Sequence, residues 1–167
     1  MKNLPRLKKS DLDKSKDDTW DYLFHFIDAY YKILDADPTG DVFDEFSTEQ
    51  HTLLAYNTVY GEVTNGGFLQ LIQNGYGAFI FEDPFAENIE LWGAKETAKI
   101  VNQAKLIYDK NKDDLEKETT IEEFSEMYKQ YPEFEPLDDQ FYDIMDNDVE
   151  IVRKYVENNI LKFAVIE

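Results

Sequence analysis

The sequence contains no cysteine, so disulfides, thiolate nucleophiles and zinc–thiolate sites are excluded. Arginine is scarce as well: the chain has Arg6 and Arg153 and no others, so bidentate clamps on phosphate groups are not expected. No stretch approaches the roughly 20 apolar residues that span a bilayer, and residues 1–16 lack the apolar core of a signal peptide. We therefore expect a soluble, cytoplasmic protein.

Negative charge is what the sequence has in excess. The 167 residues include 36 acidic and 17 basic side chains, a formal net charge of −19. With 43% hydrophobic and 15% aromatic residues, the chain is too apolar to be a disordered acidic polymer, and its length predicts one domain with a buried core. Such a chain has no excess of cations to displace counterions from nucleic acid, and it is repelled by anionic membranes. Neither is expected as a direct partner, whereas a cationic partner, metal ions or simple solubility remain as explanations of the charge.

The charge is distributed unevenly. Residues 1–16 carry six basic and two acidic side chains, for +4, so residues 17–167 carry −23. From Ile33 to Ala94 there is no lysine or arginine among 62 residues, and the segment 111–150 has fifteen carboxylates and three lysines. Solubility does not require the removal of every cation, so this layout favours an anionic binding surface. We expect two parts: a mobile or loosely docked basic segment, 1–16, and an all-α domain, 17–167.

Helical periodicity dominates the remainder of the chain. Apolar residues recur at helical spacing over 20–34, with Thr19 as the expected N-cap. The sequence predicts further helices after Ser47, 68–73, after Asp83-Pro84, 94–108, after Thr120, 137–145 and 149–161. Residues 163–166 fit a terminal strand or a packed tail. The prediction is an all-α fold, a single compact domain of seven to nine helices.

Two local patterns predict how helices begin and end. Ser47 with Gln50, and Thr120 with Glu123, have the spacing of capping boxes, in which each side chain satisfies a backbone N–H of the other residue. The dipeptide Gly66-Gly67, after Asn65, predicts a break, because these residues adopt left-handed backbone angles at little cost.

Three candidate chemical sites have simpler explanations. Residues 35–42 match several positions of a calcium-binding loop, but Phe46 stands where the bidentate glutamate belongs and Pro38 lies inside, so we interpret the segment as a turn. His25 and His51 have no catalytic partner at a recognisable spacing. The carboxylates of 143–150 could gather around a cation, but a solvated helix end is the simpler reading. No catalytic residue, metal site or cofactor is predicted.

The segment 62–75 is unusual, because Glu62, Asn65, Gln70 and Asn74 are embedded in an otherwise apolar helix–turn–helix. Buried polar groups must be hydrogen-bonded. One interpretation is a polar network that fixes the turn; the other is a ligand pocket lined by these four side chains. We favour the first, since amides rarely perform acid–base chemistry.

This pattern, E-x-x-N-G-G-F-x-Q-x-x-x-N, followed by an acidic spacer and an alanine-rich helix that opens at Gly93-Ala94, resembles the small acidic DNA-mimic protein family. The resemblance is strongest over 47–108. It implies an all-α fold whose carboxylates imitate DNA phosphates and occupy the DNA-binding face of a transcription regulator. The motif residues would then mark the fold: Glu62, Asn65, Gly66, Gly67, Phe68, Gln70 and Asn74.

The leading hypothesis is a non-enzymatic protein that binds the basic surface of a DNA-binding protein, such as a helix-turn-helix regulator, and that could form a homodimer. The carboxylates expected to form its binding surface are Asp113, Asp114, Glu116, Glu122, Glu123, Glu126, Asp138, Asp139, Asp143, Asp146 and Asp148. An alternative is a small-ligand binder or enzyme with its pocket at the polar motif. A third is an immunity-type partner protein recognised through an apolar patch among the tyrosines.

Overall fold

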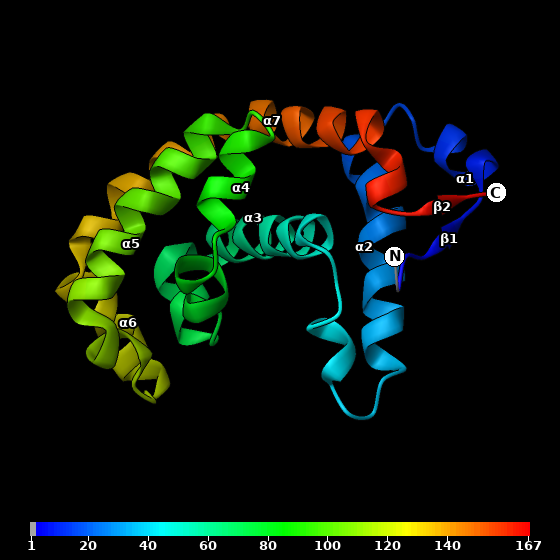
Figure 1. Cartoon of the computed structure of the whole chain (residues 1–167). Coiled ribbons are helices and arrows are strands. Elements are labelled where there is room, and N and C mark those ends of the chain that lie inside the picture. The colour runs from blue at the N-terminus through cyan, green and yellow to red at the C-terminus, as the bar shows by residue number, and fades with distance from the viewer. Residues whose placement is uncertain (1–2) are drawn as a thin grey trace. The chain divides into compact units, whose positions relative to one another are not determined.

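The computed structural model describes residues 3–167, which are almost entirely helical (Figure 1). The elements follow one another as β1 (Arg6–Leu7), α1 (Lys9–Lys14), α2 (Thr19–Asp35), the short helix η1 (Asp41–Phe43), α3 (Thr48–Gln73), the π-helix η2 (Ala78–Glu82), α4 (Phe85–Leu91), α5 (Lys95–Glu116), α6 (Ile121–Gln130), η3 (Pro132–Phe134), α7 (Glu135–Asn158), η4 (Ile160–Lys162) and β2 (Val165–Ile166). The all-α prediction is confirmed, and the seven α-helices of the described residues lie within the predicted range.

These elements pack as two compact units. Unit 1 comprises the chain up to Leu54 together with Val149–Glu167, and unit 2 comprises Ala55–Asp148. Helices α3 and α7 each contribute one segment to each unit. The division of the chain at residue 16 stays a prediction.

Unit 1 is organised around α2, which buries one face through Leu23, Phe26, Ile27 and Tyr30. The Tyr30 hydroxyl, itself buried, donates to the carbonyl of Phe163 at 2.8 Å. This bond ties the middle of α2 to the C-terminal end of the chain.

The start of α2 differs by one residue from the prediction. Asp18, not Thr19, is the N-cap: its backbone is extended and its carboxylate accepts from the N–H of Asp21 at 2.8 Å. Aspartate and threonine both cap helices well, so composition alone could not distinguish the two neighbours.

The basic segment forms regular structure with the other end of the chain. Strand β1 pairs in parallel with β2, with Arg6 opposite Val165 and Leu7 opposite Ile166 (Figure 1). The Arg6 guanidinium lies 2.6 Å from the Glu167 carboxylate, and Leu12 of α1 is buried. The strand expected within 163–166 is thus confirmed. The mobility expected of the basic segment stays a prediction.

Unit 2 has an aromatic core around Phe68, Phe81 and Tyr108. The ring of Phe81 lies 6.3 Å from that of Phe68 and 4.8 Å from that of Tyr108. Gly77 allows this packing, because a Cβ at that position would lie 2.7 Å from the Tyr108 ring. The chain therefore passes against α5 at a distance that a larger residue would not permit.

The other predicted helix boundaries are confirmed in part, and the helix predicted over 94–108 extends to Glu116. Both capping boxes form. Helix α4 begins one residue later than predicted, with Pro84 as N-cap. The two helices predicted over 137–145 and 149–161 are one continuous helix, α7. The aspartates and asparagine at 146–148 favour helix ends in isolation, but here a buried contact of Asp148 keeps that segment in the helix.

Candidate functional site

Helix α3 is interrupted at Gly67, as the sequence predicted. Gly67 has φ 79° and ψ −177°, angles that no other residue type adopts readily. In an unbroken helix the N–H of Phe68 would donate to the carbonyl of Thr64. The break separates these two groups, and each needs a new partner.

Two tyrosines from later helices supply partners for the carbonyls at the break. Tyr142 of α7 donates its hydroxyl to Thr64 at 2.8 Å, and Tyr128 of α6 donates to the carbonyl of Gly66 at 2.7 Å. Neither tyrosine was singled out in the sequence, because no local pattern reveals a bond between residues 62 and 78 positions apart.

Asp138 supplies the partner for the N–H group. Its carboxylate accepts from the N–H of Phe68 at 2.9 Å, and it lies so close to Gly67 that a Cβ there would be 2.3 Å from the carboxylate oxygen. The pKa of Asp138 is raised to about 6, chiefly by burial and also by the charges of Asp139 and Glu135, while the bond from Phe68 acts in the opposite direction. Asp138 was predicted to belong to the binding surface; it is half-buried and engaged in the fold.

On its other side the break is fixed by the polar network that the sequence suggested. The Glu62 carboxylate accepts from the amide of Gln70 at 2.8 Å and from that of Asn74 at 2.9 Å, and Asn65 donates to Gln70 at 3.2 Å. A Cβ on Gly66 would meet the Gln70 side chain at 2.1 Å. The four polar side chains of the motif thus bind one another across the bend, and the mainly structural role of the motif stays a prediction.

Of the eleven carboxylates predicted to form a binding surface, nine are exposed. The exposed ones are Asp113, Asp114, Glu116, Glu122, Glu123, Glu126, Asp139, Asp143 and Asp146. Asp148 is 1% exposed, so its assignment to the surface is wrong. It accepts from the N–H of Thr97 at 2.9 Å and from its hydroxyl at 2.7 Å. The charge of a residue in a sequence does not reveal whether that residue is buried.

The exposed acids near the end of α5 are partly neutralised. Asp114 accepts from Lys117 at 2.8 Å and from the hydroxyl of Tyr131. These bonds hold the pKa of Asp114 below its usual value. Glu116 accepts from the hydroxyl of Tyr108 at 2.5 Å. These carboxylates serve contacts within unit 2.

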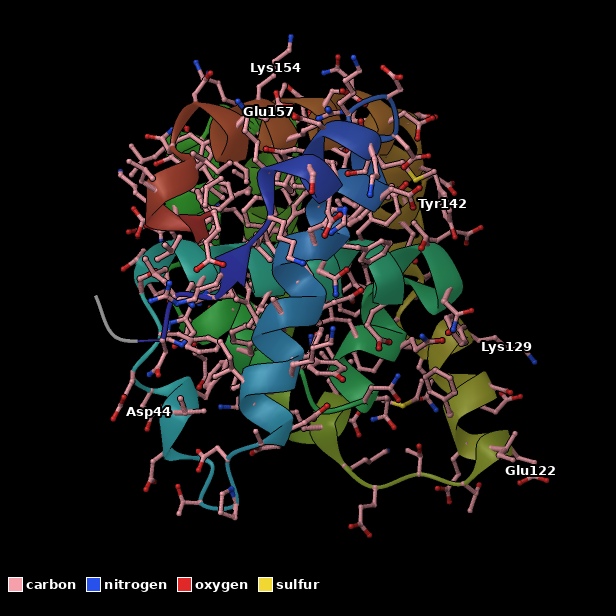
Figure 2. The ribbon with its side chains drawn as sticks, turned by 90° about the vertical axis from the view of Figure 1, so that its right-hand side faces the viewer. Asp44, Glu122, Lys129, Tyr142, Lys154 and Glu157 are labelled. Atoms are coloured by element: carbon pink, nitrogen blue, oxygen red, sulfur yellow. The ribbon has the colours of Figure 1, made fainter. Side chains whose placement is uncertain are left out.

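Helices α6 and α7 carry acids that are much less compensated. Between residues 121 and 148 there are ten carboxylates and one lysine, Lys129, which pairs with Glu126 at 3.1 Å. We call the following residues the α6–α7 acidic face: Glu122, Glu126, Asp139, Asp143 and Asp146. In Figure 2 the labelled Glu122, Lys129 and Tyr142 lie along the same edge of unit 2.

The α7 part of this face follows directly from helix geometry. Asp139, Asp143 and Asp146 are spaced i, i+4 and i+7, so they lie on one side of the helix, over a rise of about 10 Å. None of the three carboxylates makes a hydrogen bond or ion pair with any residue between 3 and 167. Glu133 and Glu135, which are not among the carboxylates predicted to form the binding surface, are also exposed.

The calcium-like segment is a turn, as interpreted from the sequence. Asp37 accepts from the N–H of Thr39 at 3.0 Å, from its hydroxyl at 2.8 Å, and from the N–H of Val42 at 2.9 Å. These bonds lower the pKa of Asp37. Residues 3–167 contain no group of three or more histidine, aspartate or glutamate side chains arranged to hold a metal ion.

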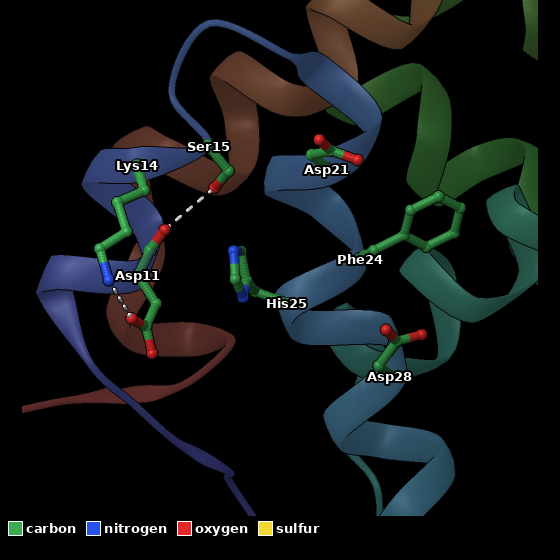
Figure 3. A pocket seen from close by; sticks show the side chains of 7 residues that line it. All are labelled: Asp11, Lys14, Ser15, Asp21, Phe24, His25 and Asp28. Atoms are coloured by element: carbon green, nitrogen blue, oxygen red, sulfur yellow. Dashed lines mark hydrogen bonds and ion pairs between the residues drawn. The ribbon is translucent and has the colours of Figure 1, made fainter.

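His25 lines a surface hollow of about 530 Å³ in unit 1, between α1 and α2 (Figure 3). Ser15 in the same hollow donates to the carbonyls of Asp11 and Leu12, at 3.3 and 3.1 Å. Lys14 pairs with Asp11 at 3.4 Å. The serine therefore bonds backbone rather than the imidazole, and the hollow has no nucleophile–base pair. His51 lies elsewhere in unit 1, with its Nε2 2.7 Å from the carbonyl of Phe43.

Comparison with known proteins shows the family of this chain. A model of DMP19-like proteins matches residues 44–159. The chain belongs to the DMP19-like family. It is 33% identical over 123 residues to the DNA mimic protein DMP19 of Neisseria meningitidis serogroup B (strain ATCC BAA-335 / MC58). The aligned region covers 72% of this chain and 73% of that protein.

The resemblance to DNA-mimic proteins is thus confirmed. The DMP19-like match contains the bend at Gly67 and the whole α6–α7 acidic face, whereas the basic segment lies outside it. Among residues 3–167, no helix combines the length and apolar character that crossing a membrane requires.

Proposed function

We propose that this chain is a DNA mimic, whose α6–α7 acidic face binds the basic, DNA-binding surface of a partner protein such as a transcription regulator. The role is binding rather than catalysis. The relative DMP19 carries the description of a DNA mimic, which supports the same role here.

The observation that carries the proposal is the unpaired row of Asp139, Asp143 and Asp146. These three charges occupy about 10 Å of helix. A B-DNA duplex carries about six phosphate charges over that length, on all its sides, at one per 1.7 Å. One face of α7 thus offers about half the charge of the duplex, with no cation within residues 130–152. Unit 2 as a whole has 21 acidic residues and 7 lysines, a net charge of −14.

Competition with DNA tests the proposal. The protein, immobilised at low salt, is used to capture partners from the native cell extract, and a captured DNA-binding protein is then purified with its duplex. Fluorescence anisotropy of the labelled duplex measures its displacement by the chain. We expect displacement that weakens steeply as salt is raised, because the interaction is between exposed charges.

A matched pair of variants assigns the effect to the acidic face. The first replaces Glu122→Gln, Asp139→Asn, Asp143→Asn and Asp146→Asn. The second replaces four exposed acids of unit 1, Asp28→Asn, Asp35→Asn, Asp41→Asn and Asp44→Asn, and has the same net charge. At about 0.35 kcal/mol per exposed pair, the first should compete at least about tenfold less well. The second should stay within about twofold of wild type. Equal losses in the two variants, or no displacement by the wild type, would exclude the proposal.

A further inference from the structure

Tyr142 and Tyr128 are 44% and 42% exposed, although both hydroxyls point inward to α3. The pKa of Tyr128 is raised, chiefly by burial, as expected for a hydroxyl turned away from water. Since the hydroxyls are engaged, what these residues offer to a partner is the aromatic ring.

Tyr142 lies on a side of α7 that carries acids of the acidic face. Asp139 is three residues before Tyr142 and Asp146 is four residues after it, so both are its neighbours on the helix surface. Residues 130–152 include no lysine or arginine. This side of α7 therefore carries two carboxylates next to Tyr142, and the segment 130–152 supplies no cation to pair with them.

In unit 1, a tyrosine ring and a helical carboxylate both contact an arginine of the chain itself. The guanidinium of Arg153 lies 4.7 Å from the centre of the Tyr22 ring and 3.0 Å from the Glu157 carboxylate. The chain thus shows, in one place, how a tyrosine ring and a helical carboxylate together hold an arginine.

We propose that Tyr142, with Asp139 and Asp146, forms a receptor for an arginine side chain of the basic partner. The guanidinium stacks on the ring while its N–H groups donate to the carboxylates. This inference rests on the proposed function and specifies its chemistry. Arginine fits better than lysine, because its planar fork stacks on aromatic rings, pairs with carboxylates in two places and is less strongly hydrated.

The test compares two acetylated, amidated octapeptides, one of alternating glycine and arginine and the other of alternating glycine and lysine. Titration calorimetry at low salt measures the affinity of each for the full chain. The peptides have equal charge, so a preference for arginine reports stacking and geometry rather than charge alone. We expect the arginine peptide to bind about three- to tenfold more tightly.

Three variants and one matched control show which residues cause the preference for arginine. Tyr142→Phe keeps the ring and should retain it, whereas Tyr142→Leu should weaken the arginine peptide by about two- to fivefold and leave the lysine peptide nearly unchanged. Tyr76→Leu is the matched control, since Tyr76 is 39% exposed in unit 2 but lies outside the acidic face. Asp146→Asn tests the receptor without disturbing the hydroxyl bond to α3, and it should lower the preference for arginine.

The outcomes separate this inference from the proposed function. Equal binding of the two peptides, or an arginine preference that survives both Tyr142→Leu and Asp146→Asn, would overturn the receptor and leave the acidic face as a simple charged surface. If neither peptide binds, the receptor is overturned as well, whereas displacement of the duplex by the chain decides the proposed function separately.

Discussion

The carboxylate of Asp148, in the middle of α7, caps the first turn of α5 by accepting from both the N–H and the hydroxyl of Thr97. Both residues are buried, at 1% and 0% exposure. Ala94, the residue at the N-cap position of α5, makes no such bond with its side chain. The helix start is therefore satisfied from a distance of 51 residues in sequence, and the negative charge is favourable at the positive end of α5.

The first prediction concerns this contact. Asp148→Ala should lower the free energy of unfolding by about 2–4 kcal/mol, because it leaves the buried N–H and hydroxyl of Thr97 without an acceptor. Asp146→Ala, two positions earlier and exposed, should change it by less than about 0.5 kcal/mol. Urea unfolding followed by circular dichroism measures both, and equal effects would contradict the capping role of Asp148.

The second prediction concerns two glycines of α3 and has opposite signs. Gly67→Ala should destabilise the protein by more than about 2 kcal/mol, since it combines a positive φ with a Cβ that collides with Asp138. Gly61→Ala should stabilise it by about 0.5–1 kcal/mol, because that position is helical and the space around it is open. Thermal unfolding of the two variants provides the comparison; a stable Gly67→Ala protein would show that the bend is not fixed there.

The third prediction concerns pH. Because the pKa of Asp138 is raised to about 6, the folded state holds a proton that the unfolded state releases near pH 4. The contribution of this group to stability is thus fully present below pH 4 and is lost as the pH rises from about 4 to about 6. For a partly exposed group we expect a loss of about 1–2 kcal/mol.

Asp138→Asn keeps an acceptor for Phe68 but does not titrate, so its unfolding free energy should lack this component. Asp143→Asn, on the exposed side of the same helix, should keep it. Urea unfolding at several pH values between 4 and 7 measures the slopes. Parallel curves for wild type and Asp138→Asn would show that Asp138 titrates normally.

The fourth prediction separates two adjacent acids of α6. Glu123 accepts from the N–H of Thr120 at 3.0 Å within the capping box, whereas Glu122 makes no hydrogen bond among residues 3–167. Glu123→Ala should therefore lower the free energy of unfolding by about 1 kcal/mol, and Glu122→Ala by less than about 0.5 kcal/mol. Equal effects on chemical denaturation would exclude the capping contribution.

Much of the fold could be predicted because its signals are local. Each capping box is contained within four residues, and two successive glycines indicate the break at Gly67. The continuity of α7 could not be predicted, because it depends on the contact between Asp148 and a threonine in another helix. Local preference favoured a helix end there, and burial overrode it.

The residues of the candidate site could likewise be predicted only in part. Nine of the eleven acids selected within the acidic segment 111–150 are exposed. The sequence could not separate Asp138 and Asp148 from their exposed neighbours, since all are aspartates in the same acidic run. The part played by Tyr128 and Tyr142 depends on backbone groups that become free only when α3 bends, and no spacing within α6 or α7 reports that.

The bend of α3 also constrains the order in which the chain can fold during its synthesis. Its three substitute partners, Tyr128, Asp138 and Tyr142, are synthesised 62 to 78 residues after the groups that they satisfy. At about 5–20 residues per second, the ribosome takes about 3–16 s to provide them. Until then the halves of α3 can form as separate helices, but the joint between them cannot close. The helices that carry the acidic face are therefore also the late-arriving pieces that complete unit 2, so a chain stopped before them would lack both its charge and its closed joint.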